Sequence, residues 1–277
     1  MRILVACQTM TSISGSPMYN FTLALELHRR GHSVAVYSMF EDNELQSELV
    51  KRKIMTCYSV PSGRFDLALI SQPDNASLVE EIAADKIINI VHSEYDCESP
   101  IISKKIDHYV AIRKSIKDHL ISEHNIPEDN ISIIYNGIDF NRFSKKKRKA
   151  NDDDYIKVVI PCTLDLLRKN FIEYYTKKAS DKFRVFLYGT DYGMDFYKNE
   201  FVSVNPAVFN IEEKIKDADL VAGILLGRVN LEARAMGIVS TIHNPERPED
   251  FSYFFPVWED FEKEHDIKNV VDKLLSL

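Results

Sequence analysis

Short apolar, β-branched runs alternate with helical patterns along most of the chain, and this alternation restricts the fold more than any other feature. A strand pattern at residues 3–7 is followed by a helical pattern at 17–30 and by a second strand pattern at 33–37. Ser16 suits the N-cap of that helix, and Gly31 suits its C-terminal stop. Strands that alternate with helices form a parallel sheet covered on both faces, so the sequence predicts an α/β fold.

The same alternation continues to the end of the chain. Further strand patterns lie at residues 54–60, 67–71, 87–91, 108–112, 131–135, 156–160, 184–188, 201–204, 220–224 and 238–242. Further helical patterns lie at residues 77–84, 115–124, 171–178, 211–216, 229–236 and 267–275. Residues 144–155 interrupt the pattern with basic and acidic runs that carry almost nothing apolar, which is typical of a solvated connector.

We therefore expect two doubly wound, Rossmann-like domains facing each other across a cleft, where ligands bind in such folds. The expected boundaries are 1–143 for the first domain, 144–155 for the linker and 156–277 for the second domain. A chain of 277 residues that is 45% hydrophobic can build both cores.

Composition excludes several classes of protein. A formal net charge of −7 argues against general nucleic-acid binding, which needs a large cationic surface. No apolar run reaches the length of a membrane-spanning helix, and the N-terminus lacks the pattern of a signal peptide, so we expect a cytoplasmic protein. The four cysteines follow neither a zinc pattern nor a disulfide framework.

Four motifs, in the right order, resemble those of family-four GT-B glycosyltransferases. Segment 136–143, NGIDFNRF, is similar to the end of that family's first domain, and segment 227–237, GRVNLEARAMG, is similar to its donor-nucleotide helix. Segment 15–37 is similar to the family's opening, and segment 107–112, DHYVAI, is similar to one of its strands. The resemblance spans nearly the whole chain. It implies a retaining, metal-independent hexosyltransferase with a nucleoside-diphosphate sugar on its second domain and a saccharide or lipid-linked acceptor on its first, as in polysaccharide biosynthesis.

The donor motif also has a physical interpretation. An apolar strand that reaches Gly227 and opens into a helix leaves unpaired N–H groups at the helix start, and these suit a diphosphate. In the motif Arg228 adds a cation near the phosphates, Val229 and Asn230 belong to the same donor segment, and Glu232 accepts hydrogen bonds from the ribose. The alternative is an ordinary strand-to-helix connection with a solvated glutamate.

The resemblance supplies five further candidates. Lys169 matches a lysine that contacts the donor phosphates, and Arg168 replaces the arginine that usually follows the preceding strand. His92, at the end of a strand, matches a histidine near the reacting sugar, and Gly15 and Ser16 stand in the opening loop that approaches phosphate, where two glycines are usual. The alternatives are two solvent-facing charges for Arg168 and Lys169, and a hydrogen-bonded loop residue for His92.

Departures from the family keep other functions open. Ile224 stands where many members have the first glutamate of an E-x7-E pair, and with the short second domain this makes a non-catalytic GT-B subunit the first alternative function. Another GT-B-shaped enzyme, such as a nucleotide-sugar epimerase, is the second. The acidic run 152–154 lies in the expected linker and precedes a strand, so we expect neither a metal nor another cofactor. The basic run 145–149 leaves peripheral membrane contact as a minor alternative, raised by the lipid-linked acceptors of the family.

Overall fold

The computed structural model describes residues 1–40, 44–254 and 260–277, and its chain divides into two compact units. Unit 1 comprises Met1–Ser12, Ser16–Gly137 and Lys263–Leu277, and unit 2 comprises Ile13–Gly15 and Ile138–Glu262. Each unit is an α/β domain built on a single large sheet, so the predicted fold class is confirmed.

The sheet of unit 1 has seven strands, all parallel. In spatial order they are β3 (Met55–Cys57), β2 (Ser33–Met39), β1 (Arg2–Thr9), β5 (Leu67–Ser71), β7 (Ile87–Val91), β8 (His108–Ala111) and β9 (Ile131–Ile133). The strand order reverses between β1 and β5, and the carboxyl edge at such a switch point is where doubly wound folds bind ligands. β4 (Arg64–Phe65) and β6 (Ala83–Ala84) form a small separate sheet.

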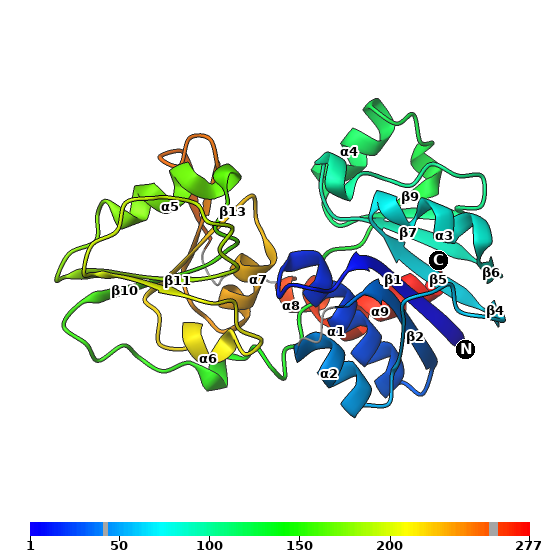
Figure 1. Ribbon diagram of the computed structural model, residues 1–277, viewed down its shortest axis with the longest axis horizontal. Coiled ribbons are helices and arrows are strands. Elements are labelled where there is room, and N and C mark those ends of the chain that lie inside the picture. The colour runs from blue at the N-terminus through cyan, green and yellow to red at the C-terminus, as the bar shows by residue number, and fades with distance from the viewer. Residues whose placement is uncertain (41–43, 255–259) are drawn as a thin grey trace. The chain divides into compact units, whose positions relative to one another are not determined.

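Helices cover both faces of this sheet. Figure 1 shows α1 (Gly15–Arg29), α2 (Glu44–Lys51) and α9 (Ile267–Ser276) on one side, and α3 (Ala76–Glu81) and α4 (Lys114–Ser122) on the other. Short 3-10 turns follow strands or precede them: η1 (Pro73–Asn75), η2 (Asp96–Glu98) and η3 (Glu128–Asn130). α1 ends as predicted, because Gly31 has a φ of 84° and its N–H donates to the His28 carbonyl at 2.9 Å.

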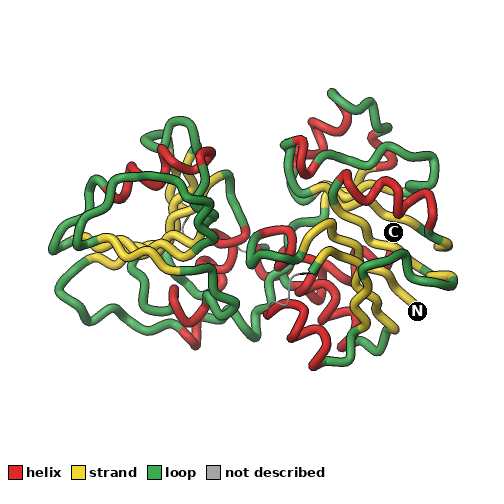
Figure 2. The backbone as a smooth tube through the Cα atoms, viewed as in Figure 1, coloured by secondary structure: helices red, strands yellow, loops and turns green. Residues whose placement is uncertain are grey.

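The sheet of unit 2 has six strands in the order β12 (Val202–Asn205), β11 (Phe183–Tyr188), β10 (Ile156–Pro161), β13 (Leu220–Ile224), β14 (Ser240–His243) and β15 (Phe251–Phe254). The first five are parallel, and β15 pairs antiparallel with β14. The switch point lies between β10 and β13. The tube in Figure 2 shows the strands of each unit gathered together with helices outside them.

Side chains of β10 alternate between two cores, as they must in a buried strand. Val159 joins a core with α6 (Glu212–Ile215) and α7 (Arg228–Ala235), whereas Val158 and Ile160 join a core with α5 (Lys169–Thr176). The strand is therefore covered on both faces, which explains why its three buried residues, 158–160, are apolar in succession.

The observed units differ from the predicted domain boundaries at the linker. The chain passes from unit 1 to unit 2 between Gly137 and Ile138, and the charged segment 144–155, including η4 (Lys145–Lys147), lies within unit 2. Its side chains are mostly exposed, as expected, but the Lys149 N–H donates to the Lys216 carbonyl at 2.9 Å. Composition reveals that a segment is solvated and does not reveal that its backbone is held.

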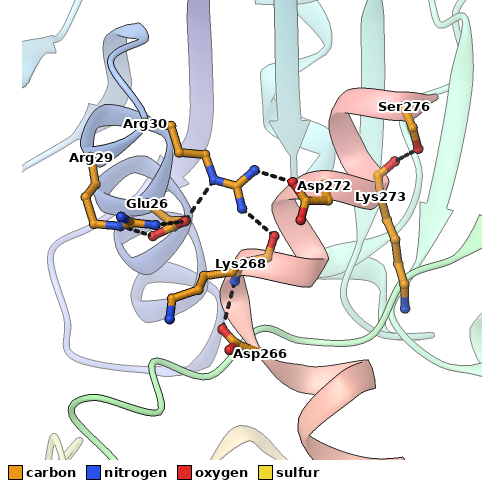
Figure 3. Close-up of polar contacts among 8 residues, drawn as sticks. All are labelled: Glu26, Arg29, Arg30, Asp266, Lys268, Asp272, Lys273 and Ser276. Carbon is orange, nitrogen blue, oxygen red and sulfur yellow. Dashed lines mark hydrogen bonds and ion pairs between the residues drawn. The ribbon is translucent and has the colours of Figure 1, made fainter.

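The end of the chain also differs from the prediction, because residues 263–277 belong to unit 1. Figure 3 shows the contacts of α9 with the end of α1: Arg30 donates to the Lys268 carbonyl at 2.6 Å and pairs with Asp272. Glu26 accepts hydrogen bonds from Arg29 at 2.7 Å and from Arg30 at 2.8 Å. We call this group the α1–α9 clasp.

A second contact lies where the chain leaves and re-enters unit 1. α8 (Phe261–His265) ends at His265, whose Nδ1 lies 2.9 Å from the Asn136 carbonyl oxygen. A Cβ atom on Gly137 would come within 3.1 Å of the Ile267 Cα atom. Gly137, after which the chain leaves unit 1 for the long segment of unit 2, and the segment after Lys263, where it returns, are therefore neighbours within unit 1.

Candidate functional site

The loop between β13 and α7 has an unusual backbone. Leu225 and Leu226 both adopt left-handed conformations, with φ of 53° and 51°, which cost energy for residues with a side chain. Gly227 follows at the N-cap position of α7, and its N–H donates to the Ile224 carbonyl at 3.0 Å. Strained non-glycine residues persist where the surrounding structure fixes them, often at ligand sites. This loop lies at the carboxyl edge of the β10/β13 switch point.

Two candidates of the donor motif contact each other. Arg228 Nε donates to Glu232 Oε1 at 2.6 Å, and both side chains are buried. Burial raises the pKa of the Glu232 carboxyl, while the charges of Arg228 and Arg142 oppose that rise. The sequence assigned Arg228 to phosphate and Glu232 to ribose separately. In the structure the two side chains form an ion pair with each other. A ligand that contacts either group therefore contacts one that already has the other as its partner.

Arg142 and Glu212 form a second buried ion pair in unit 2 that sequence analysis did not assign. Arg142 Nη2 lies 2.8 Å from Glu212 Oε2, and the guanidinium also donates to the Phe209 carbonyl and lies over the Phe209 ring. Arg142 belongs to the quoted segment 136–143, whose resemblance was the only available signal. The pair ties Arg142 to the start of α6. There its positive charge lies close enough to Glu232 to oppose the rise in the pKa of that carboxyl.

The next two residues of the motif anchor the helix. Val229 packs against the core that contains α6 and α7. Asn230 is fully buried, and its Nδ2 donates to the Thr241 carbonyl on β14 at 2.9 Å. A Cβ atom on Gly223 would come within 3.1 Å of the Asn230 Cγ atom, so Gly223 leaves the room this amide needs. These contacts hold α7 against the sheet.

Arg168 and Lys169 follow β10, whose carboxyl end lies beside that of β13 in the parallel sheet. Arg168 ends η5 (Leu166–Arg168) and pairs with Asp165, which also caps η5 by accepting from the Arg168 N–H at 3.1 Å. Lys169 is 40% exposed, and its Nζ lies 3.9 Å from Glu173 Oε1. Lys169 is therefore paired with a carboxylate less closely than Arg168 is.

Glu173 has a closer partner one turn further on. Lys177 Nζ lies 2.6 Å from Glu173 Oε2, and this hydrogen bond lowers the pKa of the Glu173 carboxyl. Lys177 is thus the closer ion-pair partner of Glu173. The two lysines flank one carboxylate, and only Lys169 lies at the sheet edge.

Unit 1 positions its own candidates at the β1/β5 switch point. His92 directly follows β7, is 8% exposed, and places Nε2 3.3 Å from the Ser71 hydroxyl. The Tyr19 ring of α1 packs edge-on against it, with ring centroids 4.8 Å apart. His92 is therefore a hydrogen-bonded residue at the sheet edge where doubly wound folds bind ligands, and its expected place near the reacting sugar stays a prediction.

The opening of α1 differs from a simple phosphate site. Gly15 is the first helical residue, and a Cβ atom there would meet no other protein atom within 4 Å. The Ser16 hydroxyl donates to Glu98 Oε1 at 2.5 Å. A carboxylate of the chain itself thus lies at this helix start.

Two features of other protein classes are absent from the part of the chain that the structure describes. In residues 1–40, 44–254 and 260–277 no group of three or more histidine, cysteine, aspartate or glutamate side chains is placed to hold a metal ion. None of the helices that the structure describes is both long and apolar enough to cross a membrane.

Comparison with known proteins identifies the architecture. No protein-family model matches the chain, and no curated protein matches it in sequence. Solved structures do match: HepE from Anabaena in complex with UDP-glucose is 14% identical with a TM-score of 0.72, and the match covers 100% of both chains. AviGT4, a glycosyltransferase of avilamycin A biosynthesis, is 10% identical with a TM-score of 0.64, over 100% of this chain and 96% of that one.

A glycosyltransferase from Rickettsia africae is 14% identical with a TM-score of 0.65, over 88% of this chain and 79% of that one. At such identities the likeness shows the fold alone. The chain has the GT-B fold, with two Rossmann-like domains.

Proposed function

We propose that this protein is a metal-independent glycosyltransferase that transfers a sugar from a nucleoside-diphosphate donor, held by unit 2, to a saccharide or lipid-linked acceptor. The observation that carries the proposal is the edge of unit 2, where a strained loop opens into α7 beside the buried Arg228–Glu232 pair. A helix start of this kind binds an anion through its unpaired N–H groups. Because HepE, a structural neighbour, is recorded with UDP-glucose, UDP-sugars are the first donors to test.

The chemistry requires charge stabilisation more than a dedicated nucleophile. As the glycosidic bond breaks, negative charge develops on the leaving diphosphate, and fixed positive groups lower that barrier. The start of α7 and Lys169 supply such groups. Lys169 suits this task better than Arg168, since Arg168 is already paired with Asp165.

Glu232 is proposed to accept hydrogen bonds from the ribose while Arg228 holds its carboxylate in place. Arg228 then acts as a positioning residue rather than as a phosphate ligand. A retaining outcome and hexosyl transfer are supported by the resemblance of segments 136–143 and 227–237, and Ile224 departs from the E-x7-E pattern of that family.

The alternatives are a non-catalytic GT-B subunit and a nucleotide-sugar epimerase. Nucleotide release from UDP-, GDP- and ADP-sugars, measured with and without a mixed cell extract as acceptor, separates the three. We expect acceptor-dependent release that persists in EDTA. Absence of release would favour the subunit, conversion of the sugar without acceptor would favour the epimerase, and loss of release in EDTA with rescue by Mn²⁺ would contradict the metal-independent mechanism.

A further inference from the structure

Polar side chains from several elements gather at the carboxyl edge of unit 1, around the β1/β5 switch point. They come from the start of α1, the ends of β5 and β7, and η2, and they are Ser16, Asn20, Ser71, Gln72, His92 and Glu98. Hydrogen bonds join Ser16 and Gln72 to Glu98, and Ser71 lies within bonding distance of both Asn20 and His92. We call these six residues the unit 1 edge cluster.

Gln72 holds the cluster together at a cost in backbone energy. Its φ of 70° and ψ of 140° fall in a region that residues with a side chain rarely adopt. Its Oε1 accepts from the Gln8 N–H at 2.8 Å and from the Cys7 thiol at 3.3 Å, while its Nε2 donates to Glu98 Oε1 at 3.2 Å. The side chain therefore fixes Glu98 relative to the end of β1.

Glu98 is the charged member of the cluster. Oε1 accepts hydrogen bonds from Ser16 and Gln72, whereas Oε2 is buried and accepts none from the residues that the structure describes. A buried carboxylate oxygen without a donor is costly, and a ligand hydroxyl would remove that cost.

A neighbour on the same loop shows how differently Glu98 is placed. Glu94 pairs with Arg113 and accepts a hydrogen bond from Ser115 at 2.7 Å. These hydrogen bonds outweigh burial and lower the pKa of Glu94. Glu98 forms no ion pair with any described residue. Its charge is therefore not neutralised locally.

The charge of Glu98 bears on what can bind beside α1. A carboxylate that accepts from Ser16 at the first turn of α1 repels a second anion at the same place. The diphosphate contact expected of Gly15 and Ser16 is therefore disfavoured, while hydroxyl groups, which donate hydrogen bonds, are favoured.

We propose that the unit 1 edge cluster binds an uncharged saccharide and that Glu98 determines its specificity, by accepting a hydrogen bond from a sugar hydroxyl and by repelling saccharides that carry a carboxylate. The proposal rests on the proposed function, in which this saccharide is the acceptor. It adds a property that the GT-B fold does not specify, namely the charge of the acceptor.

Direct binding tests the proposal without turnover. Glucose, galactose and mannose are each titrated against the corresponding uronate, which differs only in carrying a carboxylate at C6, and binding is followed by saturation-transfer NMR on the full chain. Wild-type protein should bind at least one neutral hexose about tenfold more tightly than its uronate, since a like charge is placed beside Glu98. Glu98→Gln should reduce that preference to within about threefold.

The control is Glu94→Gln, which removes one negative charge from the same loop and should leave the preference unchanged. Equal wild-type binding of hexose and uronate, no binding of any of the three hexoses, or an unaltered preference in Glu98→Gln would each overturn the proposal. The wild-type comparison needs no variant, so it stands whether or not Glu98→Gln folds.

Failure of this inference is distinct from failure of the proposed function. Nucleotide release with no hexose preference would refute only the role of Glu98. A Glu98-dependent preference without nucleotide release from any donor would refute the transferase and retain the saccharide site.

Discussion

Each unit has a switch point in its sheet, and the two carboxyl edges at these points carry side chains of different charge. In unit 1 the β1/β5 edge carries Glu98, whose charge no described residue neutralises by an ion pair. In unit 2 the β10/β13 edge carries the start of α7, the balanced Arg228–Glu232 pair and the loosely paired Lys169. Since the strand order around both switch points is alike, the loops and not the sheets decide the ligand. A phosphate suits the second edge and an uncharged ligand suits the first.

The largest expected difference concerns the loss of a carboxylate at each edge. Glu232→Ala removes the carboxylate that faces the buried Arg228 guanidinium, so we expect it to lower the free energy of unfolding by about 3–5 kcal/mol. Glu98→Ala removes a charge that has no ion-pair partner and should cost about 1–2 kcal/mol through its two lost hydrogen bonds. Urea unfolding of both variants measures the two losses. Equal losses would mean that the two carboxylates are held alike.

A control for this prediction is the double variant Arg228→Ala/Glu232→Ala. It removes both charges of the buried pair, so it should be more stable than Glu232→Ala alone. Additive losses would show that the pair is not coupled.

The next largest effect is on turnover at the edge of unit 2. Lys169→Ala should raise the activation barrier by about 2.7–4 kcal/mol, because it removes a charge that stabilises the leaving diphosphate. Lys177→Ala is the matched control, since Lys177 contacts the same Glu173 from the other side and lies outside the proposed site. The turnover number for nucleotide release measures both. Equal rates in the two variants would make Lys169 an ordinary surface lysine.

A smaller effect tests Glu232 as the ribose acceptor. A hydrogen bond to a charged partner is worth about 1.5–3 kcal/mol, so 2′-deoxy or 3′-deoxy nucleoside diphosphate should bind about tenfold or more weakly than the ribo form. Glu232→Gln, which cannot offer a charge, should lose most of this difference. Calorimetric titration of the ribo and deoxy nucleotides against both proteins measures it. A difference that survives the substitution would remove Glu232 from the donor site.

The smallest effect is on acid stability, where the two units should respond with opposite sign. Although burial raises the pKa of Glu26, hydrogen bonds from Arg29 and Arg30 outweigh it and hold the pKa below 4.5. The α1–α9 clasp therefore contributes its full stability to the folded state above pH 4.5. This contribution is lost as the pH falls through the pKa of Glu26 in the folded state. For Glu232 the pKa is raised, so its contribution is full below 4.5 and is lost as pH rises through the folded value.

Unfolding of Glu26→Gln and Glu232→Gln, each compared with wild type across this range, should give differences of opposite slope. The contribution of Glu26 to the free energy of unfolding should be on the order of 1 kcal/mol. It is small because the Arg29 and Asp272 side chains are 62% and 66% exposed, so water screens the clasp. Parallel slopes would contradict the assignment.

Local pattern predicted most of the elements because apolar periodicity is a property of neighbouring residues. The predicted strands 67–71, 87–91 and 220–224 coincide with β5, β7 and β13, and the predicted helix 229–236 lies within one residue of α7. β15 was missed because antiparallel pairing at an exposed edge places no long apolar run in the sequence.

The candidate site was predicted less completely, since its geometry depends on long-range contacts. Glu98 reaches Ser16 and Gln72 from distant parts of the chain, and nothing in the sequence around η2 indicates that meeting. Arg228 and Glu232 lie four residues apart on one helix, so their spacing alone is enough to predict the ion pair. The left-handed Leu225 and Leu226 have no sequence signal, because leucine is an uncommon residue for that conformation.

The contact between Asn136 and His265 has a consequence for the history and engineering of this chain. Apart from the short segment Ile13–Gly15, unit 2 is one stretch, Ile138–Glu262, and the chain leaves and re-enters unit 1 around it at neighbouring points, so this stretch is in effect an insertion into a domain whose last helix closes it. A short peptide that joins residue 137 to residue 263 directly should therefore give a free-standing unit 1, with the clasp of α9 intact. Removal of the last ten residues would instead damage unit 1, although in sequence they lie furthest from its first strand.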